Sequence, residues 1–398
     1  MKRLRIAMIG SRGVPARWGG VERHVEELGA ELVRRGHQVT VFCRSNYGDG
    51  ERPREHRGMR LEHLPTVGTK HLDAIVHSAL STGAAMAGGF DVLHYHALGP
   101  GACALLPRCL GGARVVLTVH GLDDQRAKWG GAARRVLRTA GWLSARVPDA
   151  TIVVSRDLAR HYRDRHGRAT AYVPNGAPAS APCPPPGRLL ETLGLRPRGF
   201  LLFVGRFVPE KAPDLLLRAF GQLGGQVRLA LVGDSSFSAD YLRDLRDQAR
   251  ADGRVVFTGF RYGAELDELY ANAAAFVLPS LLEGLPLTLL EAAVRGTPVV
   301  ASAIPPHVEV IGADGPGHRM VPPGDRDALV AALRAVLEAP ARERDGALRL
   351  GERVRATYRW ETAAAGTEEV YRWALERRPP AELAALTLPV PKDEGSVA

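Results

Sequence analysis

The chain has 398 residues and 45% apolar content, enough for two globular domains, and no run reaches the ~18 apolar residues that a transmembrane helix needs. Its four cysteines show neither CxxC spacing nor a neighbouring histidine cluster, which argues against a disulfide framework or a cysteine metal site. The net charge of +10 comes from residues 1–175, which contain 27 Lys and Arg against 15 Asp and Glu, but no strip of basic and aromatic residues typical of nucleic-acid binding accompanies it.

The first apolar run follows a basic N-terminus and ends at Gly10. A signal peptide also begins with basic and then apolar residues, but no small-residue cleavage site follows here. We therefore interpret Leu4–Ile9 as a buried strand and expect a cytoplasmic protein. The basic excess of this half would suit anionic lipid headgroups or a phosphorylated acceptor, although a genome rich in arginine codons would produce the same excess.

Short apolar runs alternate with amphipathic stretches along the whole chain, as is typical of α/β proteins with parallel sheets flanked by helices. The clearest helix is Gly20–Arg35, which has Val25, Leu28 and Leu32 on one face. The strands expected in the first half are Leu4–Ile9, Gln38–Cys43, Met59–Leu64, Val92–Tyr95, Val115–Val119, Thr151–Val154 and Ala171–Val173.

The segment Ala177–Gly187 is so rich in proline that it cannot form a helix or an inner strand. We interpret it as a linker between one domain of residues 1–176 and another of residues 188–359. The strands expected in the second domain are Phe200–Val204, Arg228–Val232, Val255–Thr258, Ala275–Leu278 and Pro298–Ala301. Its expected helices are Pro213–Leu223, Ala239–Ala251, Ala264–Ala271, Pro286–Arg295 and Arg326–Glu338. The proline-rich tail Pro379–Ala398 is expected to be solvated and disordered.

Two acidic residues flank a strand–loop–helix segment in the second domain. The expected strand ends at Leu278, Glu283 lies in the loop, and Glu291 lies one to two turns into the helix that begins at Pro286. The amides of Leu287 and Thr288 would point out of this helix N-terminus, which is a natural phosphate site. Carboxylates on both sides of a bound diphosphate would suit sugar hydroxyls, although a capping or a solvated carboxylate would have the same sequence.

Two cations follow the first strand of the second domain. The strand ends at Gly205, and Arg206 and Lys211 follow before a helix that starts near Pro213. On a loop at the carboxyl end of a strand, this pair would neutralise a diphosphate as its charge grows on departure. Solvated surface cations would be the plainer interpretation of either residue alone.

Together these motifs resemble those of retaining glycosyltransferases of family 4. The segment from Glu283 to Glu291 resembles the E-x7-E signature of that family, and Gly205 to Lys211 resembles its phosphate loop. The shorter matches are Trp18–Glu22, Thr118–Gly121, Val173–Gly176, Val232–Asp234 and Phe257–Phe260. The resemblance implies an α/β GT-B fold, in which two Rossmann-like, doubly wound domains face each other across a cleft. It also implies that a terminal helix, at about residues 360–377, packs back on the first domain.

The resemblance implies roles for matching residues. His120 would lie near the reacting sugar, Arg206 and Lys211 would hold the donor diphosphate, and Glu283 would contact hydroxyls of the transferred sugar. The other expected donor contacts are Gly19, Gly20, Gly205, the backbone of Phe260, Leu287, Thr288 and Glu291, which would bind the ribose. One departure is Pro286, which stands where many members have glycine and so offers the sugar no amide.

The resemblance further implies a hexosyltransferase that retains anomeric configuration, with the departing phosphate taking the proton of the acceptor. No cofactor and no metal are expected, because the nearest approach to a D-x-D motif is Asp123-Asp124, more typical of a polar loop. UDP is the nucleotide that the family favours.

The acceptor is the least defined partner. Lys70, Arg126 and Asn175 are candidates for its contacts, and a basic surface near them would suit a lipid-linked saccharide at the inner face of a membrane. A soluble natural-product acceptor stays open, because the chain shows no membrane segment.

Three other classes of protein compete with the transferase interpretation. A nucleotide-sugar epimerase would not be expected to carry the pair of glutamates. A dinucleotide oxidoreductase would have G-x-G-x-x-G after the first strand, where this chain has Gly10, Gly13 and a helix-breaking Pro15. A non-catalytic sugar-nucleotide-binding protein stays open.

Overall fold

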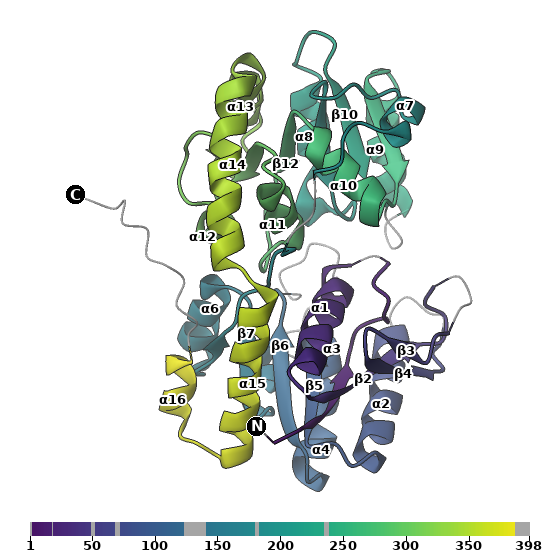
Figure 1. Cartoon of the computed structure of the whole chain (residues 1–398), viewed down its shortest axis with the longest axis vertical. Coiled ribbons are helices and arrows are strands. Elements are labelled where there is room, and N and C mark those ends of the chain that lie inside the picture. The colour runs from purple at the N-terminus through teal and green to yellow at the C-terminus, as the bar shows by residue number, and fades with distance from the viewer. Residues whose placement is uncertain are drawn as a thin grey trace, which may run out of the picture. The chain divides into compact units, whose positions relative to one another are not determined.

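The computed structural model describes residues 2–17, 19–48, 52–67, 72–122, 141–179, 183–234 and 239–386. These residues form two compact units, and each is a mostly parallel sheet covered by helices (Figure 1). The N-terminal unit contains residues 2–122, 141–176 and 357–386 of the described chain, and the C-terminal unit contains residues 177–356. Among the helices described, none combines the length and the apolar character needed to cross a membrane.

The N-terminal unit is built on an eight-stranded sheet in the order β3-β4-β2-β1-β5-β6-β7-β8. All neighbours pair in parallel except β3 and β4. The inner strands are almost entirely buried, and β1 and β6 are mostly apolar, as expected for a parallel sheet covered by helices, whereas β5 also buries two histidines. The strands are β1 (Arg5–Ile9), β2 (Gln38–Arg44), β3 (Glu55–His56), β4 (Met59–Leu64), β5 (Val92–His96), β6 (Arg114–Val119), β7 (Ala150–Val153) and β8 (Ala171–Tyr172).

Helices of the N-terminal unit include two that carry candidate site residues or pack against them. The first, α1 (Gly20–Arg34), follows Gly19, whose φ of 100° favours glycine, and buries Val25, Leu28 and Leu32. The second, α15 (Trp360–Glu376), comes from the far end of the chain and packs on α1, β6 and β7. The other helices are α2 (Leu72–Ala87), α3 (Leu98–Gly101), the 3₁₀ turn η1 (Ala102–Ala104), α4 (Leu105–Leu110), α6 (Arg156–His166) and α16 (Pro380–Ala385).

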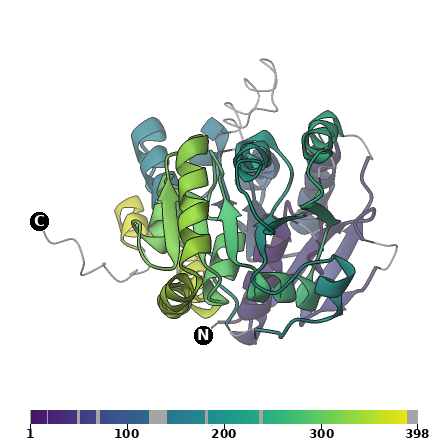
Figure 2. The same cartoon turned by 90° about the horizontal axis from the view of Figure 1, so that it is seen from above.

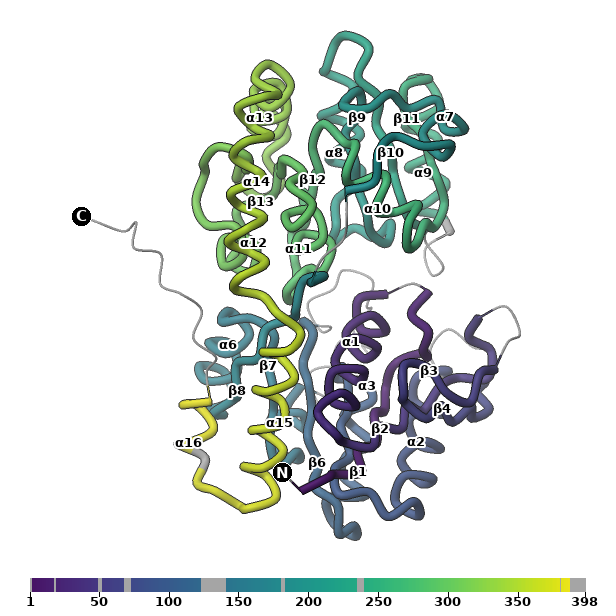
Figure 3. Tube along the Cα trace, in the orientation of Figure 1, coloured from purple at the N-terminus to yellow at the C-terminus, as the bar shows by residue number. Residues whose placement is uncertain are grey.

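The prediction of a disordered tail from Pro379 onward is wrong for its first part. Pro380 begins α16, since a proline in the first helical position loses no intrahelical hydrogen bond. Leu383 is buried, and α16 lies against β8 (Figure 3). Burial of this side chain, which composition does not reveal, holds the segment in place. Residues 387–398 lie outside the described chain.

The C-terminal unit is built on a six-stranded parallel sheet in the order β11-β10-β9-β12-β13-β14. Helices cover both faces of this sheet (Figure 2), with α8, α9 and α13 contributing to one apolar core. The strands are β9 (Phe200–Val204), β10 (Arg228–Val232), β11 (Val255–Gly259), β12 (Ala275–Leu278), β13 (Val299–Ser302) and β14 (His318–Val321). The helices are α7 (Arg188–Thr192), the 3₁₀ turn η3 (Pro209–Lys211), α8 (Pro213–Phe220), α9 (Ala239–Ala249), α10 (Gly263–Asn272), α11 (Leu287–Val294), α12 (Pro305–Ile311), α13 (Arg326–Glu338) and α14 (Pro340–Thr357).

The predicted strands Phe200–Val204, Arg228–Val232 and Ala275–Leu278 and the helix Arg326–Glu338 are confirmed to the residue. The elements that sequence reasoning missed include β3, β14, α7, α12 and α14. The strand β14 is short and half polar, and α12 opens with two prolines, so neither has the apolar periodicity of its class.

Both sheets have a topological switch point, which is where ligands of open parallel sheets bind. In the N-terminal unit the strand order reverses between β1 and β5, and in the C-terminal unit between β9 and β12. The candidate residues at the carboxyl ends of these strands are therefore placed where the fold favours a site.

Candidate functional site

In the C-terminal unit, backbone hydrogen bonds join the loops that follow β9, β10 and β11. The Gly205 amide donates to the Val232 carbonyl at 3.0 Å, and the Gly233 amide donates to the Gly259 carbonyl at 3.0 Å. These bonds fix one loop relative to the next at the carboxyl edge of the sheet. The expected phosphate loop from Gly205 to Lys211 and the shorter matches Val232–Asp234 and Phe257–Phe260 therefore lie together at this edge of the sheet.

Glycine is required where the first two of these loops touch. Gly233 has a φ of 137°, and a Cβ at this position would lie 2.0 Å from the Gly205 carbonyl oxygen. Gly205 itself packs against Lys211, whose Cδ would be 3.0 Å from an added Cβ. Arg206 follows directly and is half-buried. The close backbone packing explains why glycine follows both strands.

Lys211 and Glu283 form an ion pair on either side of the switch point. Lys211 Nζ donates to Glu283 Oε1 at 2.6 Å, and the side chains are only 15% and 12% exposed. The amide of Leu281 donates to the Glu210 carbonyl at 2.8 Å, which joins the two loops that carry the pair. The two motifs that sequence analysis treated separately are therefore one structure.

The carboxylate of Glu283 is held in its charged form. Burial by itself would raise its pKa, but Lys211, His307 and the hydrogen bonds from Lys211 and Ser280 outweigh that effect and lower the pKa below its ordinary value. Ser280 Oγ lies 2.8 Å from the same Oε1 atom. A charged Glu283 can accept hydrogen bonds from hydroxyl groups.

His307 is a member of this site that sequence reasoning missed. It lies on α12, is fully buried, and its Nδ1 is 2.8 Å from the Ser302 carbonyl. Burial lowers its pKa to about 4, so the ring is neutral at pH 7. Its Nε2 is buried without a hydrogen-bond partner among the described residues. The only signal in the sequence was its position shortly after the end of a strand.

The helix α11 places the second glutamate where sequence analysis expected it. Pro286 is the N-cap and Leu287 the first helical residue, so Glu291 lies one turn into the helix. Tyr270 donates a hydrogen bond of 3.3 Å to Glu291 Oε2. The Thr288 hydroxyl is buried and has no partner among the residues described. First-turn amides have no intrahelical acceptor, so Leu287, Thr288 and this hydroxyl together can bind an anion.

Phe260 follows β11 and is half-buried. Its ring stacks on that of Tyr262, with centroids 6.1 Å apart and planes at 19°, and Tyr262 is itself 42% exposed. An aromatic pair at the carboxyl edge of the sheet is suited to contact a planar base, beside the backbone contact expected of Phe260.

In the N-terminal unit, the glycine-rich loop after β1 is tied to α1. Glu22 Oε1 accepts from the Arg12 amide at 3.0 Å, and Glu26 Oε2 accepts from the Ala16 amide at 3.2 Å. Gly19 and Gly20 are exposed at the start of the helix. Their contact with the donor stays a prediction.

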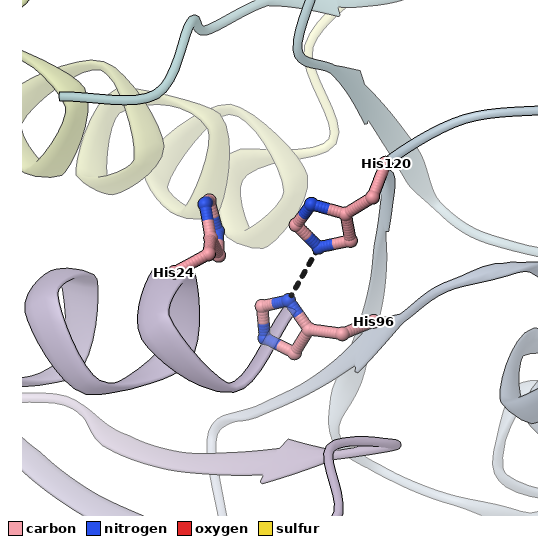
Figure 4. Close-up of side chains that lie close together, drawn as sticks. All are labelled: His24, His96 and His120. Atoms are coloured by element: carbon pink, nitrogen blue, oxygen red, sulfur yellow. Dashed lines mark hydrogen bonds between the residues drawn. The ribbon is translucent and has the colours of Figure 1, made fainter. Parts of the chain in front are cut away.

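Three histidines converge at the carboxyl edge of the N-terminal sheet (Figure 4). His120 follows β6, His96 ends β5, and His24 lies on α1. His96 Nδ1 and His120 Nε2 are 3.3 Å apart, and the centroids of the His24 and His120 rings are 4.5 Å apart. His24 and His96 are buried, whereas His120 is partly exposed. Of the three histidines, only His120 was predicted from the sequence, although the alternation His94-Tyr95-His96 places two rings on one face of β5.

The predicted acceptor contacts have different outcomes. Asn175 is buried, and its Oδ1 lies 2.8 Å from His24 Nδ1; its contact with the acceptor stays a prediction. A buried polar side chain needs a hydrogen-bond partner such as this ring. Lys70 and Arg126 lie outside the described residues, as do Asp123 and Asp124.

A fourth histidine extends the buried cluster toward α15. His94 Nδ1 lies 2.6 Å from the Tyr371 hydroxyl and its Nε2 lies 2.7 Å from Thr118 Oγ1. Burial lowers the pKa of His24 to about 4 and that of His94 to about 3, and it holds those of His96 and His120 well below 6.5. The cluster is therefore neutral at pH 7.

We expect the free energy of unfolding to fall as the pH decreases from 6.5 towards about 5. Between pH 6.5 and about 5, the histidines of the unfolded chain become protonated while those of the folded cluster stay neutral. This difference lowers the free energy of unfolding by up to about 1.4 kcal/mol per pH unit for each histidine. Urea unfolding across this range measures the slope, and a His24→Asn variant should show a shallower one. His161→Asn, outside the cluster, is the control; equal slopes in all three proteins would contradict the prediction.

Comparison with known proteins places these features in a family context. Residues 194–355 match the family model "Glycosyl transferases group 1" and residues 18–180 match "Glycosyltransferase Family 4". A D-inositol 3-phosphate glycosyltransferase of Kineococcus radiotolerans is 29% identical over 90% of this chain and 92% of its own length. Among solved structures, sucrose-phosphate synthase from Thermosynechococcus elongatus superposes with a TM-score of 0.81 at 25% identity, over 94% of this chain and all of that one. Anabaena HepE, solved with UDP and glucose, gives 0.77 at 21%, over 93% of this chain and all of that one.

Proposed function

Because the chain belongs to glycosyltransferase family 4 and has the GT-B fold, we propose that it transfers a hexose from a nucleoside diphosphate sugar to a hydroxyl acceptor. We propose UDP as the nucleotide and retention of configuration at the anomeric carbon. The observation that carries this proposal is the Lys211–Glu283 pair at the switch point of the C-terminal sheet, beside the N-terminus of α11.

Binding of a donor would give both members of the Lys211–Glu283 ion pair new partners. Without a ligand, Lys211 and Glu283 neutralise each other in a mostly buried position. A diphosphate would draw Lys211 away and add Arg206, the Leu287 and Thr288 amides and the Thr288 hydroxyl as its partners. Glu283 would then be free to accept hydrogen bonds from the hydroxyls of the sugar. The diphosphate would thus meet cations and hydrogen-bond donors, and the sugar hydroxyls would meet a carboxylate that accepts their hydrogen bonds.

The nucleoside would extend away from the diphosphate along the same surface. Glu291 would accept hydrogen bonds from the ribose, and the Phe260 loop would contact the base. The fold that this chain shares with HepE, which was solved with UDP and glucose, supports a uridine donor.

Transfer would need little chemistry from the protein beyond positioning and charge stabilisation. As the bond from the anomeric carbon to the phosphate breaks, negative charge grows on the departing diphosphate, and Arg206 and Lys211 would stabilise it. A phosphate oxygen would take the proton of the acceptor hydroxyl, and the new bond would form on the same face of the sugar. We propose that these two cations carry the charge without a metal, and that neutral His120 contacts the reacting sugar.

For the acceptor we propose a phosphorylated or lipid-linked saccharide, used at the cytoplasmic face of a membrane. The charge excess of residues 1–175 favours an anionic partner, and the relative from Kineococcus is named for a phosphorylated inositol. Donor screening tests the proposal: the whole chain is incubated with UDP- and GDP-sugars, alone and with phosphorylated, lipid-linked or neutral acceptors. Nucleotide release that depends on an acceptor supports transfer, whereas binding without turnover under every condition would make the chain a binding protein.

Glu291→Ala should raise the donor KM by about 10-fold or more, because the ribose loses charge-assisted hydrogen bonds worth roughly 1.5–3 kcal/mol. The turnover number should change less, since the ribose is remote from the reacting carbon. Glu338→Ala, an exposed glutamate on α13, is the matched control and should leave both constants unchanged. A donor KM in Glu291→Ala equal to that of the control would remove Glu291 from the site.

A further inference from the structure

The His24, His96 and His120 cluster has a geometry that the transfer reaction does not require. Each ring offers one nitrogen, and these three atoms all lie within 4.8 Å of one another (Figure 4). The rings come from α1, from the end of β5 and from the residue after β6, which the fold brings to one edge of the sheet. One contact with a sugar would use His120 alone.

Two ring nitrogens in the cluster have unmet bonding capacity. His24 Nδ1 is engaged with Asn175, but His24 Nε2 is buried without a hydrogen-bond partner among the described residues. His96 Nε2 also lacks a partner among these residues, but the His96 nitrogen that faces His120 is Nδ1. Buried polar atoms of a native protein are normally satisfied, so an additional partner is expected here.

We propose that His24, His96 and His120 bind a divalent transition-metal ion, with Zn²⁺ as the best match. Imidazole nitrogen is a preferred ligand of zinc, and three histidines with an open fourth position are a known zinc arrangement. The 3.3 Å between His96 Nδ1 and His120 Nε2 equals the edge of about 3.3 Å expected for a tetrahedron with Zn–N bonds of about 2.05 Å. One nitrogen of His24 lies within 4.8 Å of the nitrogens that the other two rings offer.

The surroundings of the cluster favour the binding of a metal ion over protonation of the rings. A metal ligand must be a neutral imidazole, and the burial that lowers the pKa values of these rings keeps them neutral at pH 7. Asn175 Oδ1 accepts the Nδ1 proton of His24, which would fix the tautomer that leaves Nε2 for a metal.

The site has a consequence for turnover that rests on the proposed function. If His120 contacts the reacting sugar, an ion that holds its Nε2 withdraws it from that role. Zn²⁺ should therefore inhibit transfer, and a chelator should restore it. Metal binding itself needs neither donor nor acceptor, so it can be measured whether or not the transferase assignment holds.

Titration of the chelator-treated whole chain with Zn²⁺, by calorimetry, tests the site. Co²⁺ provides a second probe, because tetrahedral Co²⁺ absorbs visible light far more strongly than octahedral Co²⁺. We expect one equivalent of tight binding and a tetrahedral Co²⁺ spectrum in the wild type, with both lost in His24→Ala and His96→Ala. Asn175→Ala should weaken Zn²⁺ binding by about 10-fold or more.

Two further variants serve as a control and as a replacement for variants that do not fold. His161 and His166 are near each other on α6 and could collect zinc at the surface, so the double variant His161→Ala/His166→Ala is the control and should bind like the wild type. If the buried substitutions prevent folding, His120→Ala, at a partly exposed position, replaces them. The proposal is overturned if the wild type binds no Zn²⁺, or if the control loses the tight equivalent while His120→Ala keeps it.

Discussion

Lys211→Ala is expected to reduce turnover by about 10²- to 10³-fold, the usual loss when one group that stabilises developing charge is removed. The substitution deletes a cation placed at the switch point. It also leaves Glu283 as a buried carboxylate without the partner that keeps it charged. Initial rates with saturating donor and acceptor measure the catalytic loss.

The second consequence of Lys211→Ala is a loss of stability. Breaking a mostly buried ion pair costs about 3 kcal/mol, because the remaining charge stays desolvated. Adding Glu283→Gln removes that charge, so the double variant should regain stability without regaining turnover. Denaturant unfolding of the wild type, both single variants and the double variant separates these two effects.

A matched control is available on the neighbouring helix α8. Arg218 is an exposed cation that pairs with Asp214 at 2.8 Å, so Arg218→Ala removes an ion pair without touching the switch point. Stability should change by less than about 1 kcal/mol and turnover should be unchanged. Wild-type turnover in Lys211→Ala would show that the pair is structural only.

Gly233→Ala is expected to abolish tight donor binding and to lower the Tm by about 6 °C or more. The new Cβ would lie 2.0 Å from the Gly205 carbonyl oxygen, at a φ of 137° that side chains rarely adopt. Neither strand end can give way cheaply, because the Gly205 and Gly233 amides are both hydrogen-bonded. The strain of about 3 kcal/mol would be relieved by moving the Gly205 loop, which displaces Arg206 and Lys211.

Gly253→Ala is the control for this substitution. Gly253 lies in the same unit, and a Cβ there would meet nothing within 4 Å. Its Tm and donor KM should match those of the wild type. Calorimetry and donor titration of both variants make the comparison. If Gly233→Ala also matches the wild type, the two loops do not depend on each other.

The sequence by itself determined most of the secondary structure and the family. Strands buried on both faces are short, continuous apolar runs, so β9, β10 and β12 could be predicted to the residue. The spacing from Glu283 to Glu291 depends on one local strand–loop–helix segment, which is why it is visible without a structure. By contrast, α16 could not be predicted, because the burial of Leu383 against a distant strand holds it in place.

Only the tertiary structure decided which side chains are partners. Lys211 and Glu283 are 72 residues apart and His24 and Asn175 are 151 apart, yet each pair is in hydrogen-bond contact. Parallel strands carry their carboxyl ends to one edge whatever the length of chain between them, so closeness there depends on strand order rather than on sequence distance. For that reason Lys211 and His120 were recognisable as single residues, whereas the ion pair, His307 and the histidine cluster required the folded chain.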